Sequence, residues 1–476
     1  MKRAVVVTWM SVIVGGVVAH GVSACASSES ESSQVPSAEE GGHATSDGGV
    51  VVESDATVVE DASGPVCSPD GWCATAVPDD ALSFVSVWPL EGRAFATAKS
   101  PSVGYRVLEW SEATGKWTYI DDGSLNQPDK PFIGNIWASG DNDVYYAMPG
   151  GTIAHGTRPT PTEPWSWKYD VLPNHVALTT DTTLASVERV QDPVNQSNYT
   201  PTIGVWGTSA GDVYAWYTNT IFHRKSTGGA APTWVAEYTA DDISTVPYGN
   251  TALDVRVLAV GVTGTGPDDL WFSFVRMSPV NLVSKCSVVV RKTGATYERI
   301  TDGTPVAASG LRNLCTEAPG YLLVGAPTLG VLSNLQPMGD GQVAGVLGGR
   351  ELVKLSASGG SYQATRTPIM SLGLMKNGEL PPTEAVQVNF TSAHAASPTS
   401  MWFAAEQIAS TSSSTHEGNV LAVRGADVWA PDGGAYGISS LSLNGGPLEG
   451  RGPQIRGTSD TNLWLMSKNH ALHKTK

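Results

Sequence analysis

Residues 136–145 read IWASGDNDVY, and residues 205–214 read VWGTSAGDVY. Both stretches place a tryptophan after an aliphatic residue, then small polar residues, and then Asp-Val-Tyr. Weaker versions of this phrase, which keep a hydrophobic start and an aromatic end, occupy residues 87–95, 262–271, 390–402 and 455–464. A phrase that returns every few tens of residues is typical of an array in which each copy is one supersecondary unit. The sequence therefore predicts one array of similar units.

Each unit reads as four short strands. In the two clearest copies a short apolar run ending in His155 or His223 follows the phrase, and Trp167 or Trp234 comes next. The chain has 52 Gly, 30 Pro and 15 Trp among its 476 residues, and only 16% of its residues are charged. This composition argues against a helical protein, because Gly and Pro punctuate short strands and helices need charged, solvated faces.

The spacing of the units predicts how many there are. The aromatic residues that end the phrase are spaced by 69, 57, 131 and 62 residues, so the gap of 131 hides a degenerate unit between residues 300 and 385, with residues 321–324 and 351–355 as candidate strands. Four-stranded sheets that stack around an axis bury both faces and leave only short edges. We predict an all-β chain with a single seven-bladed β-propeller of four-stranded antiparallel blades.

The last unit ends after three strands, and an N-terminal segment can supply the fourth. Gly71-Trp72 resembles the Gly115-Lys116-Trp117 segment of an outer strand. We expect the N-terminal strand to close the C-terminal blade, which places the propeller domain at residues 67–476.

The units resemble the tryptophan-rich repeats, of the type V-W-G-x-x-x-x-D-V-W, of extracytoplasmic propeller lipoproteins in myxobacteria and related bacteria. Residues 67–73, CSPDGWC, match the C-x-x-x-G-W-C element that precedes such arrays. The resemblance covers nearly all of residues 67–476, although only two blades carry the pattern cleanly. Most members are uncharacterised, so the resemblance implies a fold and a compartment rather than an activity.

The first 24 residues are typical of an export signal. Lys2 and Arg3 precede an apolar run that is too short for a resident membrane span. The segment ends in Val22-Ser23-Ala24-Cys25, which resembles a bacterial lipobox and implies a lipoprotein signal peptide over residues 1–24 and lipidation of Cys25. The alternative is ordinary cleavage that leaves Cys25 as a free thiol. Ala26, rather than Asp, after the cysteine implies an outer-membrane lipoprotein that faces the periplasm or the cell surface.

Residues 25–66 are expected to be a disordered acidic tether. From residue 26 to residue 66 the chain carries nine acidic residues, many Ser and Gly, and no Lys or Arg, so it cannot bury enough apolar surface to fold. A coil of this length spans about 35 Å on average. It would hold the folded domain away from the lipid surface.

The cysteine count fits an exported protein. Removal of Cys25 from the five cysteines leaves Cys67, Cys73, Cys286 and Cys315, an even set that predicts two disulfides. Proximity favours Cys67 with Cys73 and Cys286 with Cys315, although four cysteines permit three connectivities. A metal site is the weaker alternative, because no second Cys or His pair stands at ligand spacing.

Charge and motifs bear on the function class. The formal net charge of -16 repels phosphate backbones, so we expect no nucleic-acid partner. The sequence has no G-x-S-x-G elbow, no H-E-x-x-H helix, no phosphate loop and no dinucleotide fingerprint. We therefore assign no catalytic residue, no metal ligand and no cofactor, and regard an enzyme as the less favoured class.

Recurring polar residues are interpreted as structural. Asp143, Asp212 and Asp269 stand where other units have Ser400 and Asn462. Asp, Asn and Ser all carry a hydrogen-bond acceptor on a short side chain. This predicts that these residues close a turn by accepting hydrogen bonds from backbone N–H groups. Three histidines recur in the expected third strand, away from the axis, and are interpreted as inter-strand hydrogen-bonding residues rather than metal ligands: His155, His223 and His473.

One departure from the repeat suggests a binding site. Trp137 and Trp206 stand six positions before the turn residue, and His394 and Arg456 replace tryptophan at this position in two adjacent units. We expect these two to lie close together on inner strands and to form a polar patch that could meet an anionic ligand. The alternative is a half-exposed position that tolerates any large amphipathic side chain.

Long inserts suggest a binding face. Loops on a rigid scaffold are where binding resides, and the longest inserts are residues 172–202, 365–387, 406–418 and 431–453. Trp216, Tyr217 and Asn219 at a strand junction are candidate contacts, with blade packing as the alternative role. We predict a lipid-anchored binding or scaffolding module for a protein or polysaccharide at the cell envelope. The alternative is a glycan-directed hydrolase or lyase of propeller fold.

Overall fold

The computed structural model describes residues 65–124, 133–173, 189–191, 199–201, 203–226, 229–248, 250–277, 285–306, 315–324, 331–339, 341–369, 386–409, 418–431, 433–450 and 452–475. They belong to one compact unit, Ser63–Lys476. The expected signal peptide and all but two residues of the expected tether lie outside the described part. The described residues form strands, turns and loops without a helix, so none of them forms a helix able to cross a membrane.

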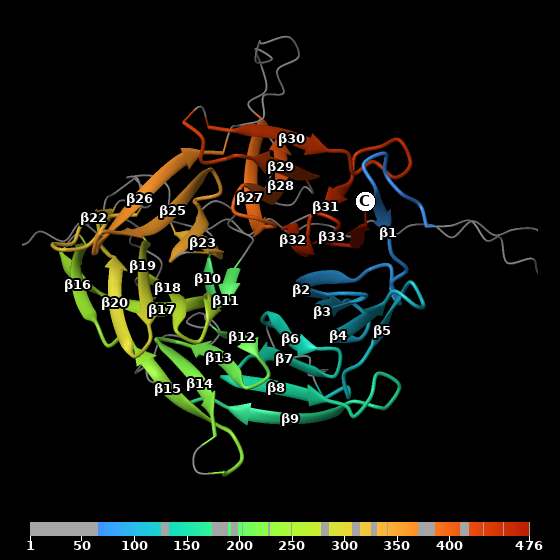
Figure 1. Ribbon diagram of the computed structural model, residues 1–476, viewed down its shortest axis with the longest axis horizontal. Coiled ribbons are helices and arrows are strands. Elements are labelled where there is room, and N and C mark those ends of the chain that lie inside the picture. The colour runs from blue at the N-terminus through green and yellow to red at the C-terminus, as the bar shows by residue number, and fades with distance from the viewer. Residues whose placement is uncertain are drawn as a thin grey trace, which may run out of the picture. The chain divides into compact units, whose positions relative to one another are not determined.

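Seven antiparallel sheets form a ring (Figure 1). The inner strands are β2 (Ser83–Leu90), β6 (Ile136–Gly140), β12 (Ile203–Ser209), β17 (Thr251–Gly266), β23 (Leu332–Gly339), β27 (Val386–Ala395) and β32 (Gln454–Ser459). The second strands are β3 (Arg93–Ser100), β7 (Asp143–Met148), β13 (Asp212–Tyr217), β18 (Asp269–Met277), β24 (Gln342–Leu347), β28 (Ser400–Ala409) and β33 (Asn462–Ser467).

The outer half of each blade completes the ring. The third strands are β4 (Gly104–Ser111), β8 (Thr152–Thr157), β14 (Thr220–Lys225), β19 (Cys286–Thr293), β25 (Glu351–Ser358), β29 (Gly418–Ala426) and β34 (His470–Lys474). The outer strands are β5 (Lys116–Tyr119), β9 (Ser166–Val171), β15 (Thr233–Thr239), β20 (Thr296–Thr301), β26 (Ser361–Pro368), β30 (Ala435–Ser439) and β1 (Trp72–Ala74). The predicted seven-bladed β-propeller is confirmed.

Burial of both sheet faces explains the composition of the middle strands. All six residues of β13 are buried, whereas no residue of the outer strand β15 is. A strand covered on both faces reads as a nearly continuous apolar run instead of an alternating one. The main hydrophobic clusters correspondingly lie between neighbouring blades rather than inside one. Each blade therefore depends on both of its neighbours.

The N-terminal strand closes the ring. β1 pairs antiparallel with β34, Trp72 opposite Lys474 and Ala74 opposite Leu472. The Trp72 side chain is fully buried, packs edge-on against Trp402 at 5.9 Å, and donates its indole N–H to Ser439 Oγ at 2.9 Å. The last blade thus contains strands from both ends of the propeller domain.

Both disulfides that proximity favoured are present. Cys67–Cys73 brackets the start of β1, and Cys286–Cys315 joins β19 to the short strand β22 (Cys315–Glu317). β22 pairs with β21 (Gly303–Pro305) just after the fourth blade. The first disulfide holds the closing strand, and the second holds the connection between the fourth and fifth blades.

The degenerate unit differs in part from the prediction. Residues 351–355 lie in β25, the third strand of the fifth blade, as expected. Residues 321–324 are not a strand of that blade, because Leu322 instead forms a parallel bridge with Thr301 at the end of β20. The inner strand β23 was not recognised in the sequence.

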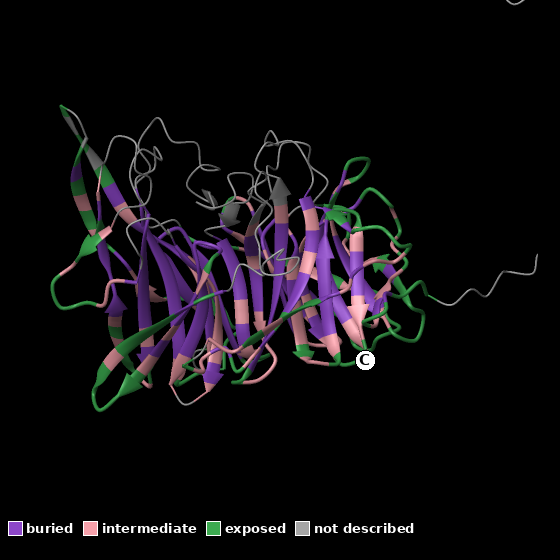
Figure 2. Cartoon of the chain, turned by 90° about the horizontal axis from the view of Figure 1, so that it is seen from above, coloured by how far each residue is buried: buried purple, intermediate pink, exposed green. Residues whose placement is uncertain are grey.

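The two faces of the ring differ in how strands are joined. Turns of two residues, such as 141–142, 210–211 and 460–461, join inner to second strands at one end, here called the turn face. Connections from outer to inner strands, and from second to third, emerge at the opposite end, here called the loop face. There β16 (Ile243–Tyr248) and β17 form a hairpin that projects beyond the ring (Figure 2).

Three of the four predicted inserts connect strands at the loop face. Residues 172–202 contain the short pair β10 (Arg189–Gln191) and β11 (Tyr199–Pro201), and otherwise lie mostly outside the described residues. Residues 370–385 and 410–417 likewise lie outside them. The fourth insert, 431–453, is split, because it contains the outer strand β30 and the short strand β31 (Glu449–Gly450).

Candidate functional site

The recurring acids are anchored to their own blades. Asp143 accepts a hydrogen bond from Ser139 and lies 2.5 Å from His155 Nε2 across the hairpin of β7 and β8. The His155 ring stacks on Tyr145 with centroids 4.0 Å apart. This group of hydroxyl, carboxylate, imidazole and aromatic ring ties the first three strands of the blade together.

The third blade repeats this group and adds a second carboxylate. Asp212 accepts a hydrogen bond from Thr208 and lies 3.0 Å from His223 Nε2, while Glu237 Oε2 lies 3.4 Å from His223 Nδ1. Burial opposes charge on His223, but the two carboxylates outweigh it and raise the pKa of His223. Hydrogen bonds from His223, Lys225 and Tyr297 lower the pKa of Glu237 against the effect of its burial.

The other blades vary the same position. In the seventh blade Asn462 Oδ1 lies 2.9 Å from His473 Nε2, and burial lowers the pKa of His473 to about 4. In the fourth blade Asp269 pairs with Arg291 at 3.0 Å, and that guanidinium lies over Trp271. The histidines therefore bond between strands of one blade, as interpreted from the sequence. The partners shown for the turn residues Asp143 and Asp212 are side chains, whereas the sequence analysis expected these residues to accept from backbone N–H groups.

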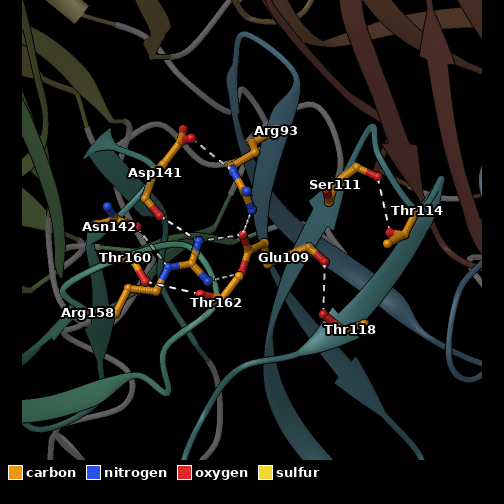
Figure 3. A network of polar contacts seen from close by, with 10 residues as sticks. All are labelled: Arg93, Glu109, Ser111, Thr114, Thr118, Asp141, Asn142, Arg158, Thr160 and Thr162. Atoms are coloured by element: carbon orange, nitrogen blue, oxygen red, sulfur yellow. Dashed lines mark hydrogen bonds and ion pairs between the residues drawn. The ribbon is translucent and has the colours of Figure 1, made fainter.

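A second polar network joins the first two blades at the turn face (Figure 3). The buried Glu109 receives two hydrogen bonds from Arg158, at 2.8 and 2.7 Å, and an ion pair from Arg93. Arg93 also pairs with Asp141 at 3.0 Å, and Arg158 donates to Asn142 Oδ1 at 3.0 Å. Two cations thus meet two anions, and the network is compensated in charge.

The position that Trp137 occupies recurs on all seven inner strands. We call these residues the axial ring: Trp88, Trp137, Trp206, Thr263, Gln336, His394 and Arg456. Each lies opposite the equivalent residue of its second strand, as Trp137 lies opposite Tyr145. The inner strands surround the axis (Figure 1), and each contributes one residue to this set.

His394 and Arg456 are neighbours within the axial ring. A Cβ atom on Gly457, the residue after Arg456, would stand 3.2 Å from His394 Nε2. Burial, and then the positive charge of Arg456, lower the pKa of His394 to about 4, so the imidazole is neutral near pH 7. The His394 Nε2 atom is buried and has no hydrogen-bond partner among the described residues.

Arg456 also touches the first blade. Its guanidinium carbon lies 5.0 Å from the centre of the Trp88 ring. Burial lowers the pKa of Arg456 to about 10, and no carboxylate of the described part pairs with it. The nearby Asp460 is already engaged by Trp402 Nε1 at 2.6 Å and by Arg424 at 3.1 Å. These three residues, Arg456, His394 and Trp88, are here called the axial patch. The patch therefore carries one positive charge that no carboxylate of the described residues pairs with.

The other three candidate contacts are buried. Trp216, Tyr217 and Asn219 expose 6%, 2% and 5% of their surface. Trp216 packs over Gly204, where a Cβ atom would meet its ring at 2.0 Å, and Asn219 Nδ2 donates to Ala240 O at 3.1 Å. In this arrangement they pack the third blade and offer no surface to a ligand, which was the alternative role considered for them.

Sequence reasoning missed a set of side chains that bond adjacent inner strands. Asn135 Nδ2 donates a hydrogen bond to Val205 O at 2.7 Å, and Val205 N donates one to Asn135 Oδ1 at 2.9 Å. Side chains at the equivalent position, two residues before the axial ring, reach the backbone of the next blade in four more cases: Ser86, Asn334, Ser392 and Gln454. The signal in the sequence is a polar residue two positions before five of the seven axial residues, while Gly204 and Gly261 stand there in the third and fourth blades.

The described residues contain no group of three His, Cys, Asp or Glu side chains placed to hold a metal ion. Many of their charged side chains are engaged in pairs within or between blades, whereas Arg456 has no ion-pair partner among the described residues. The chemistry of the axial patch is that of a cation beside a neutral imidazole and an indole ring, which suits binding of an anion.

Comparisons with known proteins give likeness in fold. No family model and no curated protein matches the chain. The β-propeller domain of Cps50 (Swd1) from Myceliophteria thermophila is 10% identical with a TM-score of 0.47, and the match covers 86% of this chain and 100% of that one.

Two further solved structures are similar at the same level. YCF48, solved with a D1 peptide, is 9% identical with a TM-score of 0.41, covering 87% of this chain and 99% of that one. A PL25 ulvan lyase bound to -[GlcA(1-4)Rha3S]- is 10% identical with a TM-score of 0.41, covering 87% and 95%. At these identities and TM-scores the likeness carries no argument about what this chain binds or does.

Proposed function

We propose that the chain is a lipid-anchored binding or scaffolding propeller of the cell envelope, and that a protein or polysaccharide partner docks on its loop face. The observation that carries this proposal is the difference between the two faces. Inner and second strands are joined by short turns, whereas the longest connections emerge at the loop face. Variable loops held by a rigid scaffold are the usual place of binding.

Compartment and anchoring belong to the same proposal. Two disulfides support an oxidising, extracytoplasmic environment. The lipobox-like residues 22–25 support acylation of Cys25, and Ala26 supports sorting to the outer membrane. A tether after the lipid would hold the folded domain away from the lipid surface.

The test compares the mature chain with a variant in which residues 410–417, which connect β28 to β29, are shortened to a two-residue turn. We expect the mature chain to retain one envelope protein or polysaccharide that the shortened variant loses. A matched variant at the turn face, Thr114→Ala, should retain it. Turnover of a glycoside or polysaccharide by the chain would contradict the proposal and favour the hydrolase or lyase.

A further inference from the structure

The axial patch has an unused hydrogen-bonding capacity. The guanidinium carbon of Arg456 lies 5.0 Å from the centre of the Trp88 ring, and its N–H groups have no hydrogen-bond acceptor among the described residues. Eleven ion pairs of the described residues engage other arginines, for example Arg158 with Glu109 and Arg276 with Asp302, both at 2.7 Å. Arg456 has no such partner there, although it is half-buried.

The surroundings of Arg456 decide which anion fits. The site carries a single positive charge, because His394 is neutral near pH 7. Asp460 is close enough to act on His394 electrostatically, which opposes a second negative charge. A planar monoanion matches the fork of a guanidinium through two parallel hydrogen bonds, whereas a phosphate dianion would leave one charge unpaired.

We propose that Arg456, Trp88 and His394 form a binding site for a carboxylate at the axial junction of the sixth, seventh and first blades. The carboxylate oxygens accept hydrogen bonds from the Arg456 N–H groups, and the buried Nε2 side of His394 lies beside them. The half-buried Trp88 ring holds the guanidinium in orientation. This inference rests on the proposed binding function and names the chemistry of one contact.

The repeat supplies a matched variant. Arg456→Trp restores the residue found at the same register in three other blades, at Trp88, Trp137 and Trp206, so it should fold while removing the charge. Arg456→Lys keeps the charge and loses the planar fork. Arg350→Gln removes an exposed arginine elsewhere and controls for the change in net charge.

The experiment titrates the mature chain with acetate, glucuronate, glucose and inorganic phosphate, with the indole N–H signal of Trp88 as readout. We expect the two carboxylates to shift that signal, at least tenfold weaker binding in Arg456→Trp, several-fold weaker binding in Arg456→Lys, and no change in Arg350→Gln. If glucuronate binds more tightly than acetate, the natural ligand carries its carboxylate on an acidic sugar. If the two bind equally, the site recognises the carboxylate alone.

Three results would overturn the site. They are equal binding of glucose and glucuronate, tighter binding of phosphate than of the carboxylates, and carboxylate binding by Arg456→Trp that is as tight as by the unchanged chain. The loop variant separates the two proposals. If the mature chain captures an envelope partner that the loop variant loses, but gives no carboxylate signal, this site alone is contradicted. If the mature chain gives the carboxylate signal but captures no such partner, the proposed docking face alone is contradicted.

Discussion

His223 and Asp212 lie 3.0 Å apart, from Nε2 to Oδ1, and Glu237 approaches the other ring nitrogen of His223 at 3.4 Å. The equivalent His473 has a neutral Asn462 in place of the aspartate. One position of the repeat therefore holds a histidine with a raised pKa in the third blade and one with a pKa of about 4 in the seventh.

The contributions of these two histidines to the free energy of unfolding should depend on pH in opposite ways. The contribution of His223 is fully present below its unfolded pKa, about 6.5, and is lost as pH rises through its raised folded pKa. His473 is held neutral, so its unfavourable contribution grows as pH falls from about 6.5 towards 4. Tm measured from pH 4 to pH 9 should lose its alkaline slope in His223→Gln and its acid slope in His473→Gln.

The variant Asn462→Asp provides the control for this interpretation. It should raise the pKa of His473 above 4, because a carboxylate then faces Nε2 as in the third blade. Titration of the His473 ring signal by NMR measures the shift directly. An unchanged pKa would show that the paired carboxylate does not set it.

The network around Glu109 should be costly to break. Glu109→Ala leaves the buried Arg158 without its carboxylate, and removal of one partner from a buried ion pair costs about 3 to 5 kcal/mol. The partly exposed pair of Arg366 and Glu351 is the control, and Glu351→Ala should cost at most about 1 kcal/mol. Urea unfolding measures both, and equal losses would contradict the buried character of the Glu109 network.

Closure by the N-terminal strand predicts a large effect at Trp72. Trp72→Ala removes a fully buried ring between the last two blades and should cost about 3 to 5 kcal/mol of unfolding free energy. Hydrogen exchange of the β34 amides should accelerate as well, because β1 covers that edge. The control is Tyr169→Ala on the outer strand β9, where the ring is 37% exposed and a much smaller loss is expected.

Acylation of Cys25 predicts a change of compartment. Cys25→Ser should move the protein from the membrane fraction to the soluble extracytoplasmic pool, because the lipid would be its only anchor after cleavage. Ala26→Asp should keep it membrane-bound but retain it in the inner membrane. Sedimentation of Cys25→Ser with membranes would contradict the lipobox assignment.

The blade phrase predicted the fold because it combines a turn, an aromatic anchor and a fixed spacing in one stretch. Blade packing was harder to predict, and Trp216 shows why. A blade is covered on both faces, so strand alternation no longer separates buried from exposed positions. A polar residue beside aromatic residues, such as Asn219, then looks like a binding site although it lies in the packed third blade.

The fifth blade was located only in part for a different reason. Its inner strand β23 has Gln336 where the clear copies have tryptophan, with Pro337 after it. Before this position the register shifts between Ser333 and Gln336, and Asn334 adopts a positive φ of 53°. Residues 321–324 have the composition of a strand, but Leu322 pairs with the end of the fourth blade. Composition alone could not decide between these two segments.

Site-specific photo-crosslinking in the intact cell can decide whether the loop face binds a partner. One crosslinker replaces Asn250, exposed at the tip of the hairpin of β16 and β17 on the loop face, and another replaces Thr114, exposed in a turn at the opposite end of a blade. We expect one discrete adduct from position 250 and none from position 114. Adducts from position 114 alone, or equally from both positions, would contradict binding at the loop face.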